Sequence, residues 1–293
     1  MHPVPLALQF AAMTSSIRDV SDTALWVAVY RAQESARPDP LFQDPLATVL
    51  AGERGKQIAD AMPYPRIMNW FLVIRTVALD RLIQAAIEQG ADTIINLGTG
   101  LDTRPYRMKL PPNLRWVEVD FPHIIDYKSE KLAPEKPVCR LERIALDLSN
   151  LPERRALFQR LGAESKKATV ITEGVIPYLA SEDAAALSED LYAIPTFQCW
   201  IQDYRQGGLR QWSPRRMKEL FKDAPFKFDA PDWLRFFKKQ GWKIDQNILA
   251  WDESRRVHRH FPFIFPWSLI GILLPPKAKR RMREASGFVM YTK

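Results

Sequence analysis

The chain has 293 residues, 46% of them hydrophobic, which is enough to bury one large α/β core. The net charge of +8 raises the question of nucleic acid, but the basic residues are spread along the chain apart from one concentration at 255–283. No RNA-binding or helix-turn-helix signature stands out, so we expect no nucleic-acid partner. Cys139 and Cys199 lie in strand-like runs without metal-ligand spacing, and residues 1–16 lack the basic start of a signal peptide. We therefore expect buried thiols, no metal site and a cytoplasmic protein.

The first ninety residues have helical character only. Asp22 and Thr23 open one apolar-periodic stretch, and residues 70–86 form a longer helix that leads into the first strand. We expect residues 1–90 to be a helical extension that acts as a lid, and residues 91–293 to be the core.

From Asp92 onward, strand-like and helix-like segments alternate, which is typical of an α/β protein with a parallel sheet. The predicted strands cover seven segments: Thr93–Leu97, Arg115–Asp120, Arg140–Leu148, Thr169–Glu173, Thr196–Tyr204, Trp242–Ile248 and Gly287–Lys293. The predicted helices between them are Pro122–Leu132, Pro152–Leu161, Ser181–Ile194 and Pro231–Gln240. Two further segments, at about 205–228 and 252–284, read as cap insertions rich in Arg, Lys, Pro and aromatic residues.

The first strand ends in a Gly-x-Gly turn, Gly98-Thr99-Gly100. Glycines take positive φ and carry no Cβ, so such a turn can bring backbone N–H groups close to a ligand. A dinucleotide fingerprint would need Gly or Ala where Thr103 stands, which disfavours a nicotinamide cofactor.

Acidic residues end the next three strands. Asp120, Asp147 and Glu173 follow Gly98 at intervals of 22 to 27 residues, so all can line one edge of a parallel sheet. Each could instead cap a helix or sit in a plain turn. Three unpaired carboxylates around one crevice would repel one another unless a polar or cationic ligand shares it. S-adenosylmethionine, a nucleoside with a positive charge, would satisfy them.

The α-carboxylate of that ligand needs a cation. Arg75, in the long helix before the core, is the best candidate, because a planar guanidinium suits a carboxylate.

These residues together resemble the leucine carboxyl methyltransferase family, in particular its bacterial branch of S-adenosylmethionine-dependent O-methyltransferases. The resemblance rests on ten motifs: Thr23-Ala24, Arg31-Ala32, Glu34, Asp44-Pro45-Leu46-Ala47, Arg75-Thr76, Asn96 to Arg104, Glu118-Val119-Asp120, Lys128, Asp147-Leu148 and Glu173 to Leu179. It spans about residues 20 to 205 and implies a class I, Rossmann-like methyltransferase fold. This fold has a seven-stranded, mostly parallel sheet with the last strand antiparallel, an N-terminal helical lid and a C-terminal insertion.

The resemblance also implies roles for single residues. Arg75 would hold the cofactor carboxylate, and Glu173 would meet the cofactor's amino group. Gly98, with Thr99 and Gly100, would lie along the methionine; Asp120 would bind the ribose; Asp147 and Leu148 would bracket the adenine; and Tyr178 would orient the acceptor. Thr99 and Pro177 depart from the family pattern, where Ala and a bulky apolar residue are more common.

We expect the acceptor to be a carboxylate of a small or apolar acid. A carboxylate is already ionised at neutral pH and needs no general base, which suits a chain without an obvious Ser/His/Asp or Cys/His set. A hydroxyl or phenol acceptor would need a base, for which His123 and Glu173 are the candidates. A nicotinamide-dependent oxidoreductase is the less favoured alternative.

The second insertion contains the apolar run 261–274 between two basic groups, within residues 255–283. The run is too short and too interrupted by proline to cross a membrane. It could line an apolar acceptor pocket or make a peripheral contact with an anionic membrane surface.

Overall fold

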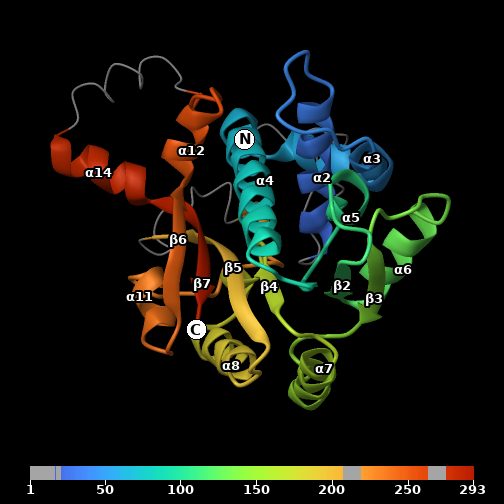
Figure 1. Cartoon of the computed structure of the whole chain (residues 1–293). Helices are drawn as coiled ribbons and strands as arrows, with labels where there is room; N and C mark the ends of the chain where they lie inside the picture. The colour runs from blue at the N-terminus through green and yellow to red at the C-terminus, as the bar shows by residue number, and fades with distance from the viewer. Residues whose placement is uncertain (1–16, 18–20, 207–218, 263–274) are drawn as a thin grey trace.

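The computed structural model describes residue 17 and residues 21–206, 219–262 and 275–293. The described chain forms one seven-stranded sheet with helices on both faces (Figure 1). The strands are β1 Thr93–Leu97, β2 Arg115–Asp120, β3 Arg140–Ala145, β4 Ala168–Thr172, β5 Phe197–Arg205, β6 Lys243–Leu249 and β7 Ser286–Thr292. The larger helices are α2 Asp22–Ser35, α3 Leu46–Ala61, α4 Pro65–Glu88, α6 Pro122–Lys131, α7 Leu151–Ala163 and α8 Ser181–Tyr192. Shorter ones are α5 Arg104–Arg107, η1 Ile176–Tyr178, α11 Trp233–Lys238, α12 Ala250–Arg256 and α14 Pro276–Glu284.

The strand order is β3-β2-β1-β4-β5-β7-β6, and β7 runs antiparallel to both of its neighbours. The remaining strands are parallel, so the predicted fold class is confirmed. The chain order reverses between β1 and β4, which places a ligand crevice beyond the carboxyl ends of these two strands.

Alternate side chains of each central strand enter different cores. Ile94 and Trp116 pack with α4 on one face, whereas Ile95 and Val117 pack with α7 and α8 on the other. All five residues of β1 are buried, which explains its continuous apolar sequence. A third core lies between α2 and α3.

The third strand is shorter than predicted. It ends at Ala145 instead of Leu148, because its partner β2 ends at Asp120, and the N–H of Leu146 donates to the carbonyl of Asp120 (2.8 Å). The following turn is closed by the N–H of Ser149, which donates to Oδ1 of Asp147 (2.8 Å).

The described part of the second insertion packs against the N-terminal helices. Arg259 forms ion pairs with Glu34 (3.0 Å) and Asp39 (2.7 Å), and its carbonyl accepts a hydrogen bond from Trp70 in α4 (2.8 Å). Phe261 stacks edge-on against Trp70. Most of the predicted apolar run, residues 263–274, lies outside the described residues. None of the described helices is both long and apolar enough to span a bilayer.

Candidate cofactor and acceptor site

The glycine turn packs closely against both α2 and the loop after β4. Gly98 (φ 64°) and Gly100 (φ 50°) both have positive φ. A Cβ on Gly98 would lie 2.5 Å from Cγ2 of Val175, and one on Gly100 would lie 3.1 Å from Cβ of Ala24. The turn therefore fits between α2 and the loop after β4 only because it carries no side chains at these positions.

Asp120 is bound to this turn. Its Oδ2 accepts from the N–H of Gly100 (2.6 Å) and its Oδ1 from the N–H of Phe121 (2.7 Å). Burial raises the pKa of Asp120, although these two N–H groups and Lys128 act against the rise. Each carboxylate oxygen keeps a second lone pair, so the group can still accept two hydroxyls. Asp120 does not cap α6 with its side chain.

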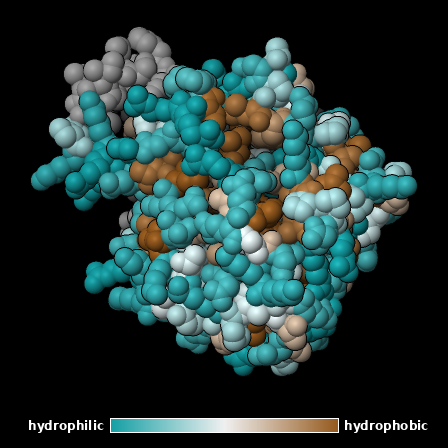
Figure 2. Space-filling model, viewed as in Figure 1, coloured by the Kyte–Doolittle hydropathy of each residue, from teal (hydrophilic) through white to brown (hydrophobic). Residues whose placement is uncertain are grey.

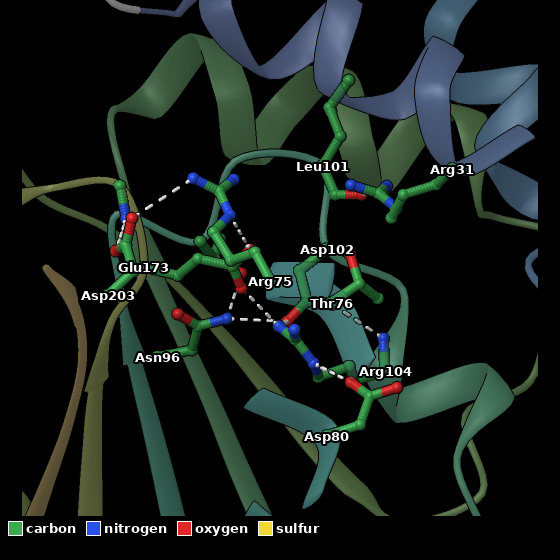
Figure 3. A network of polar contacts seen from close by, with 12 residues as sticks. Arg31, Arg75, Thr76, Asp80, Asn96, Leu101, Asp102, Arg104, Glu173 and Asp203 are labelled. Atoms are coloured by element: carbon green, nitrogen blue, oxygen red, sulfur yellow. Dashed lines mark hydrogen bonds and ion pairs between the residues drawn. The ribbon is translucent and has the colours of Figure 1, made fainter. Parts of the chain in front are cut away.

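Arg75 and Glu173 lie together at the end of β4 (Figure 3). Nε of Arg75 is 2.8 Å from Oε1 of Glu173, as an ion pair that does not align as a hydrogen bond, so this cation keeps donor capacity. Nη1 of Arg75 is 3.5 Å from Oδ2 of Asp203, and Oδ1 of Asp203 accepts from the N–H of Gly174 (2.7 Å). Burial raises the pKa of Asp203.

A second arginine, Arg104, pairs with the same carboxylate of Glu173. Arg104, which is 2% exposed, donates from Nη1 to Glu173 (2.7 Å) and Asp102 (3.0 Å), and from Nε to Asp80 (2.6 Å). Burial alone would raise the pKa of Glu173, but Arg104 and Arg75 outweigh it and hold the pKa below its usual value. Glu173 is thus not unpaired, because the protein itself supplies its cations, and the sequence premise of three unpaired carboxylates is wrong for this residue.

The hydroxyl of Thr99 lies among polar side chains of β1 and α6. It accepts from Asn96 (3.2 Å) and lies 3.4 Å from the ammonium of Lys128, a fully buried group that is paired with Glu118 (2.7 Å). A small polar side chain in place of alanine is therefore accommodated by polar partners in β1 and α6.

The N-terminal helix α2 is fastened to the same loop. Arg31 donates to the carbonyl of Leu101 (Figure 3) and to Oδ2 of Asp44 (2.8 Å). Because α2 also contacts Gly100 through Ala24, it is positioned to cover the glycine turn.

Tyr178 lies in η1, directly after the loop that carries Glu173. Burial raises its pKa to about 12, with smaller influences from a hydrogen bond to Thr23 and from the charges of Arg75 and Asp203. The phenol is therefore neutral at physiological pH and serves as a hydrogen-bonding group, not as a base. Its ring packs on Phe226 at 5.2 Å.

Asp147 and Leu148 lie beyond the end of β3, whose last residue, Ala145, stands opposite Asp120. Asp147 is exposed, and one of its oxygens closes the local turn; Leu148 is half-buried. Asn150, which follows soon after Asp147, caps α7 by accepting from the N–H of Glu153 (3.4 Å). The structure brings Arg75 together with Glu173, and Gly100 with Asp120, but gives Asp147 no contact with the other predicted site residues.

Two residues of the network were missed by the sequence argument. Asp203 stands near the end of β5, so the rule that selected Asp120, Asp147 and Glu173 could have found it. Arg104 was part of the quoted motif, but nothing in its local sequence indicates that it reaches Glu173, 69 residues away. Within the described ranges, no cluster of metal-ligating side chains is present.

The donor set fits S-adenosylmethionine. An arginine with spare donor capacity stands beside carboxylates, which complements a carboxylate and an ammonium on one ligand. Asp120, at the adjacent strand end, offers acceptors for hydroxyls.

Comparison with known proteins supports the same reading. The family model for leucine carboxyl methyltransferase matches residues 24–191. A Frankia alni protein, provisionally named as an S-adenosyl-L-methionine-dependent methyltransferase, is 34% identical over 183 residues, covering 59% of this chain and 64% of that protein, which is less than two thirds of its length. A Mycobacterium tuberculosis protein with the same provisional name is 27% identical and matches 89% of this chain and 92% of its own length.

Two solved structures share the fold. One is a protein of the DUF574 family from Streptomyces avermitilis (TM-score 0.56, 14% identity, 96% of this chain and 99% of that one). The other is a provisionally assigned methyltransferase from Thermobifida fusca (TM-score 0.53, 13% identity, 96% of each chain). The nicotinamide alternative finds no support in these matches. With its family model matching more than half of its length, this chain belongs to the leucine carboxyl methyltransferase family and is an S-adenosylmethionine-dependent methyltransferase.

Proposed function

We propose that the enzyme methylates a carboxylate oxygen of a small or apolar acid. The observation that carries this proposal is the aromatic cluster beside Tyr178, which offers an apolar wall and a neutral phenol where a base would otherwise be needed. Both candidate bases are poorly suited. Two arginines occupy Glu173 and hold its pKa below the usual value, which makes it a weak base, and the exposed His123 is hydrogen-bonded to Ser21 (2.7 Å). A phenol or alcohol acceptor is therefore the weaker alternative.

The aromatic cluster joins three segments that are distant in sequence. Phe226 lies between Tyr178 (5.2 Å) and Phe221 (5.3 Å), and Phe221 contacts Trp26 of α2 (6.4 Å), which contacts Tyr30 (5.6 Å). In the described part of the chain, Nε1 of Trp26 and the hydroxyl of Tyr30 are buried without a hydrogen-bond partner. The part of the cluster beside the phenol of Tyr178 suits a substrate that is mostly apolar and ends in oxygen atoms.

The roles that we propose for the cofactor-binding residues follow from the charges of their side chains. Arg75 would take the carboxylate and Glu173 the ammonium of the methionine part, which lies along Gly98, Thr99 and Gly100. Asp120 would accept the ribose hydroxyls, and Asp147 with Leu148 would flank the adenine. S-adenosylmethionine, when bound, supplies an electrophilic methyl group on a sulfonium. The residues of the chain hold the acceptor oxygen in line and exclude water, which is the main source of acceleration when the nucleophile is already ionised.

The acceptor class can be tested with labelled S-adenosylmethionine and a panel of apolar monocarboxylic acids. We expect base-labile methyl esters and a rate that is nearly constant between pH 6 and 9, because a carboxylic acid of pKa about 4 is fully ionised there. A phenol acceptor, with a pKa of about 10, would give a base-stable ether and a rate that rises about tenfold per pH unit. As a control, Tyr178→Phe should raise KM for the acid and leave cofactor affinity unchanged. A base-stable product would contradict the proposal.

The role of Asp120 can be tested by calorimetry with S-adenosylmethionine. Asp120→Ala should weaken binding by at least roughly 10- to 100-fold, because the loss of even one hydrogen bond to a charged acceptor costs about 1.5–3 kcal/mol. Because burial raises the pKa of Asp120, affinity should fall on acidification from a higher pH than an ordinary aspartate would give, and Asp120→Asn should remove this pH dependence. The exposed Asp126, on α6, provides the control Asp126→Ala. Unchanged strong binding in Asp120→Ala would refute the assignment.

A further inference from the structure

The helix α14 stands apart from the cores of the molecule. None of its nine residues is buried, and Figure 1 shows it at the margin, beyond α12 and the sheet. In Figure 2 the surface at this margin is hydrophilic. The helix thus contributes little to the packed interior, and its sequence is not explained by the fold.

Positive charge is concentrated here. Residues 250–285 carry eight lysines and arginines against three acidic residues, and so account for +5 of the net charge of +8. Some of these cations are used within the protein: Arg283 pairs with Asp252 (2.7 Å), Arg256 with Glu253 (2.7 Å), and Arg259 with the N-terminal region. Others are not.

Three basic side chains of α14 point to one side of the helix without an ion-pair partner among the described residues. Lys277, Arg280 and Arg281 are exposed, and their spacing of three and four positions places them on a common face. Arg283 reaches Asp252 on α12 and so marks the side of the helix that faces the protein body. At about 100° per residue, Lys277 and Arg281 lie about 120° and 160° round the helix from Arg283, whereas Arg280 lies between them and Arg283. Lys277 and Arg281 are therefore turned away from the protein body, and Arg280 lies at the edge of the same basic face.

The same helix exposes an apolar flank. Met282 is 42% exposed, and with Ala278 it occupies the flank four residues apart. A basic face beside an apolar flank is the pattern of a helix that lies on a bilayer surface, because the cations meet lipid phosphates while the apolar side chains enter the headgroup boundary. A nucleic-acid site would need base-stacking aromatics or polar readers, and α14 has neither.

We propose that α14 docks this enzyme on an anionic lipid bilayer surface, with Lys277, Arg280 and Arg281 as the headgroup contacts. The proposal rests on charge complementarity and is independent of the identity of the methyl acceptor.

The test is co-sedimentation of the full chain with vesicles of phosphatidylcholine alone and of phosphatidylcholine with about one third phosphatidylglycerol. We expect binding to the anionic vesicles only, and its loss at high salt. The variant Lys277→Gln/Arg280→Gln/Arg281→Gln should bind roughly 100-fold more weakly, at about 1 kcal/mol per cation and 1.4 kcal/mol per tenfold change. The matched control, Lys109→Gln/Lys136→Gln/Lys166→Gln, removes the same charge from exposed sites elsewhere and should bind like the wild type.

Three results would overturn the proposal. They are equal loss in the two triple variants, equal binding to neutral and anionic vesicles, and binding to duplex RNA without binding to either kind of vesicle. Circular dichroism of both variants confirms that the fold is intact, and methyl transfer to a water-soluble acid should be the same in both, since α14 is outside the proposed acceptor site.

Discussion

Replacing Arg104 by methionine is expected to lower the free energy of unfolding by about 3–5 kcal/mol, the usual cost of removing one partner from a buried ionic network. Methionine keeps the length of the side chain but leaves Asp80, Asp102 and Glu173 without their common cation. Urea denaturation at pH 7 measures the change. The control is Arg155→Met, which breaks the ion pair of a 61% exposed arginine with Asp190 and should cost less than about 1 kcal/mol. Equal losses in the two variants would refute the central role of Arg104.

The pH dependence of stability provides a second test of the variant Arg104→Met. The folded state holds the pKa values of Asp102 and Glu173 below their ordinary values: burial opposes this, and Arg104 with the other nearby cations outweighs it. The contribution of these two carboxylates to the free energy of unfolding is thus fully present above pH of about 4. It is lost as the pH falls through their lowered pKa values. In Arg104→Met this acid-dependent loss should be much smaller. If the variant does not fold, Arg104→Lys keeps the charge and should show an intermediate acid profile.

The second large effect is expected at Gly98. Gly98→Ala should destabilise the fold by about 2–5 kcal/mol, since it adds the strain of a positive φ of 64° to a contact of 2.5 Å with Cγ2 of Val175. Gly90→Ala measures the backbone strain of a positive φ alone, because Gly90 has a φ of 92° and no atom lies within 4 Å of a Cβ added there. It should cost only about 1 kcal/mol.

Val175→Ala separates the two causes at Gly98. It removes the methyl group that a Cβ added at Gly98 would strike, so the double variant should relieve the clash and keep the strain. Thermal or urea unfolding of the wild type, Gly98→Ala, Val175→Ala and the double variant completes a double-mutant cycle. We expect a coupling energy above about 1 kcal/mol between the two positions. Strict additivity of the two substitutions would show that the glycine turn and the loop after β4 are not packed as described.

The sheet could be predicted because its strands have a local signature. The bounds of β1 and β2 match the prediction, and most other strands differ by one residue, since apolar runs bounded by turns can be read without knowing their partners. The error at β3 has a physical cause: the strand-like pattern continues to Leu148, but pairing stops at Ala145, where the neighbouring strand ends. A strand ends where its partner ends, and that is not a local property.

The site could be predicted in part for the same reason. The positions of Gly98, Asp120 and Glu173 at strand ends follow from the alternation of strands and helices. The pairing of Arg75 with Glu173, and the reach of Arg104 to the same carboxylate, depend on how α4 and α5 pack against the sheet. Asp203 was overlooked because β5 leads directly into the first insertion, and the sequence beyond Tyr204 offers no recognisable motif.

The antiparallel strand β7 has a consequence for the biosynthesis of this enzyme. It pairs along its whole length with β5 and from Gly287 to Thr292 with β6, so residues 286–292 form an interior strand although they are the last of the seven strands along the chain. Until they leave the ribosome, two neighbouring strands present open edges that can recruit other chains. A chain that lacks residues 286–292 would therefore be an aggregation-prone, incomplete sheet, and the pairing of β7 with its two neighbours is a checkpoint for the whole fold.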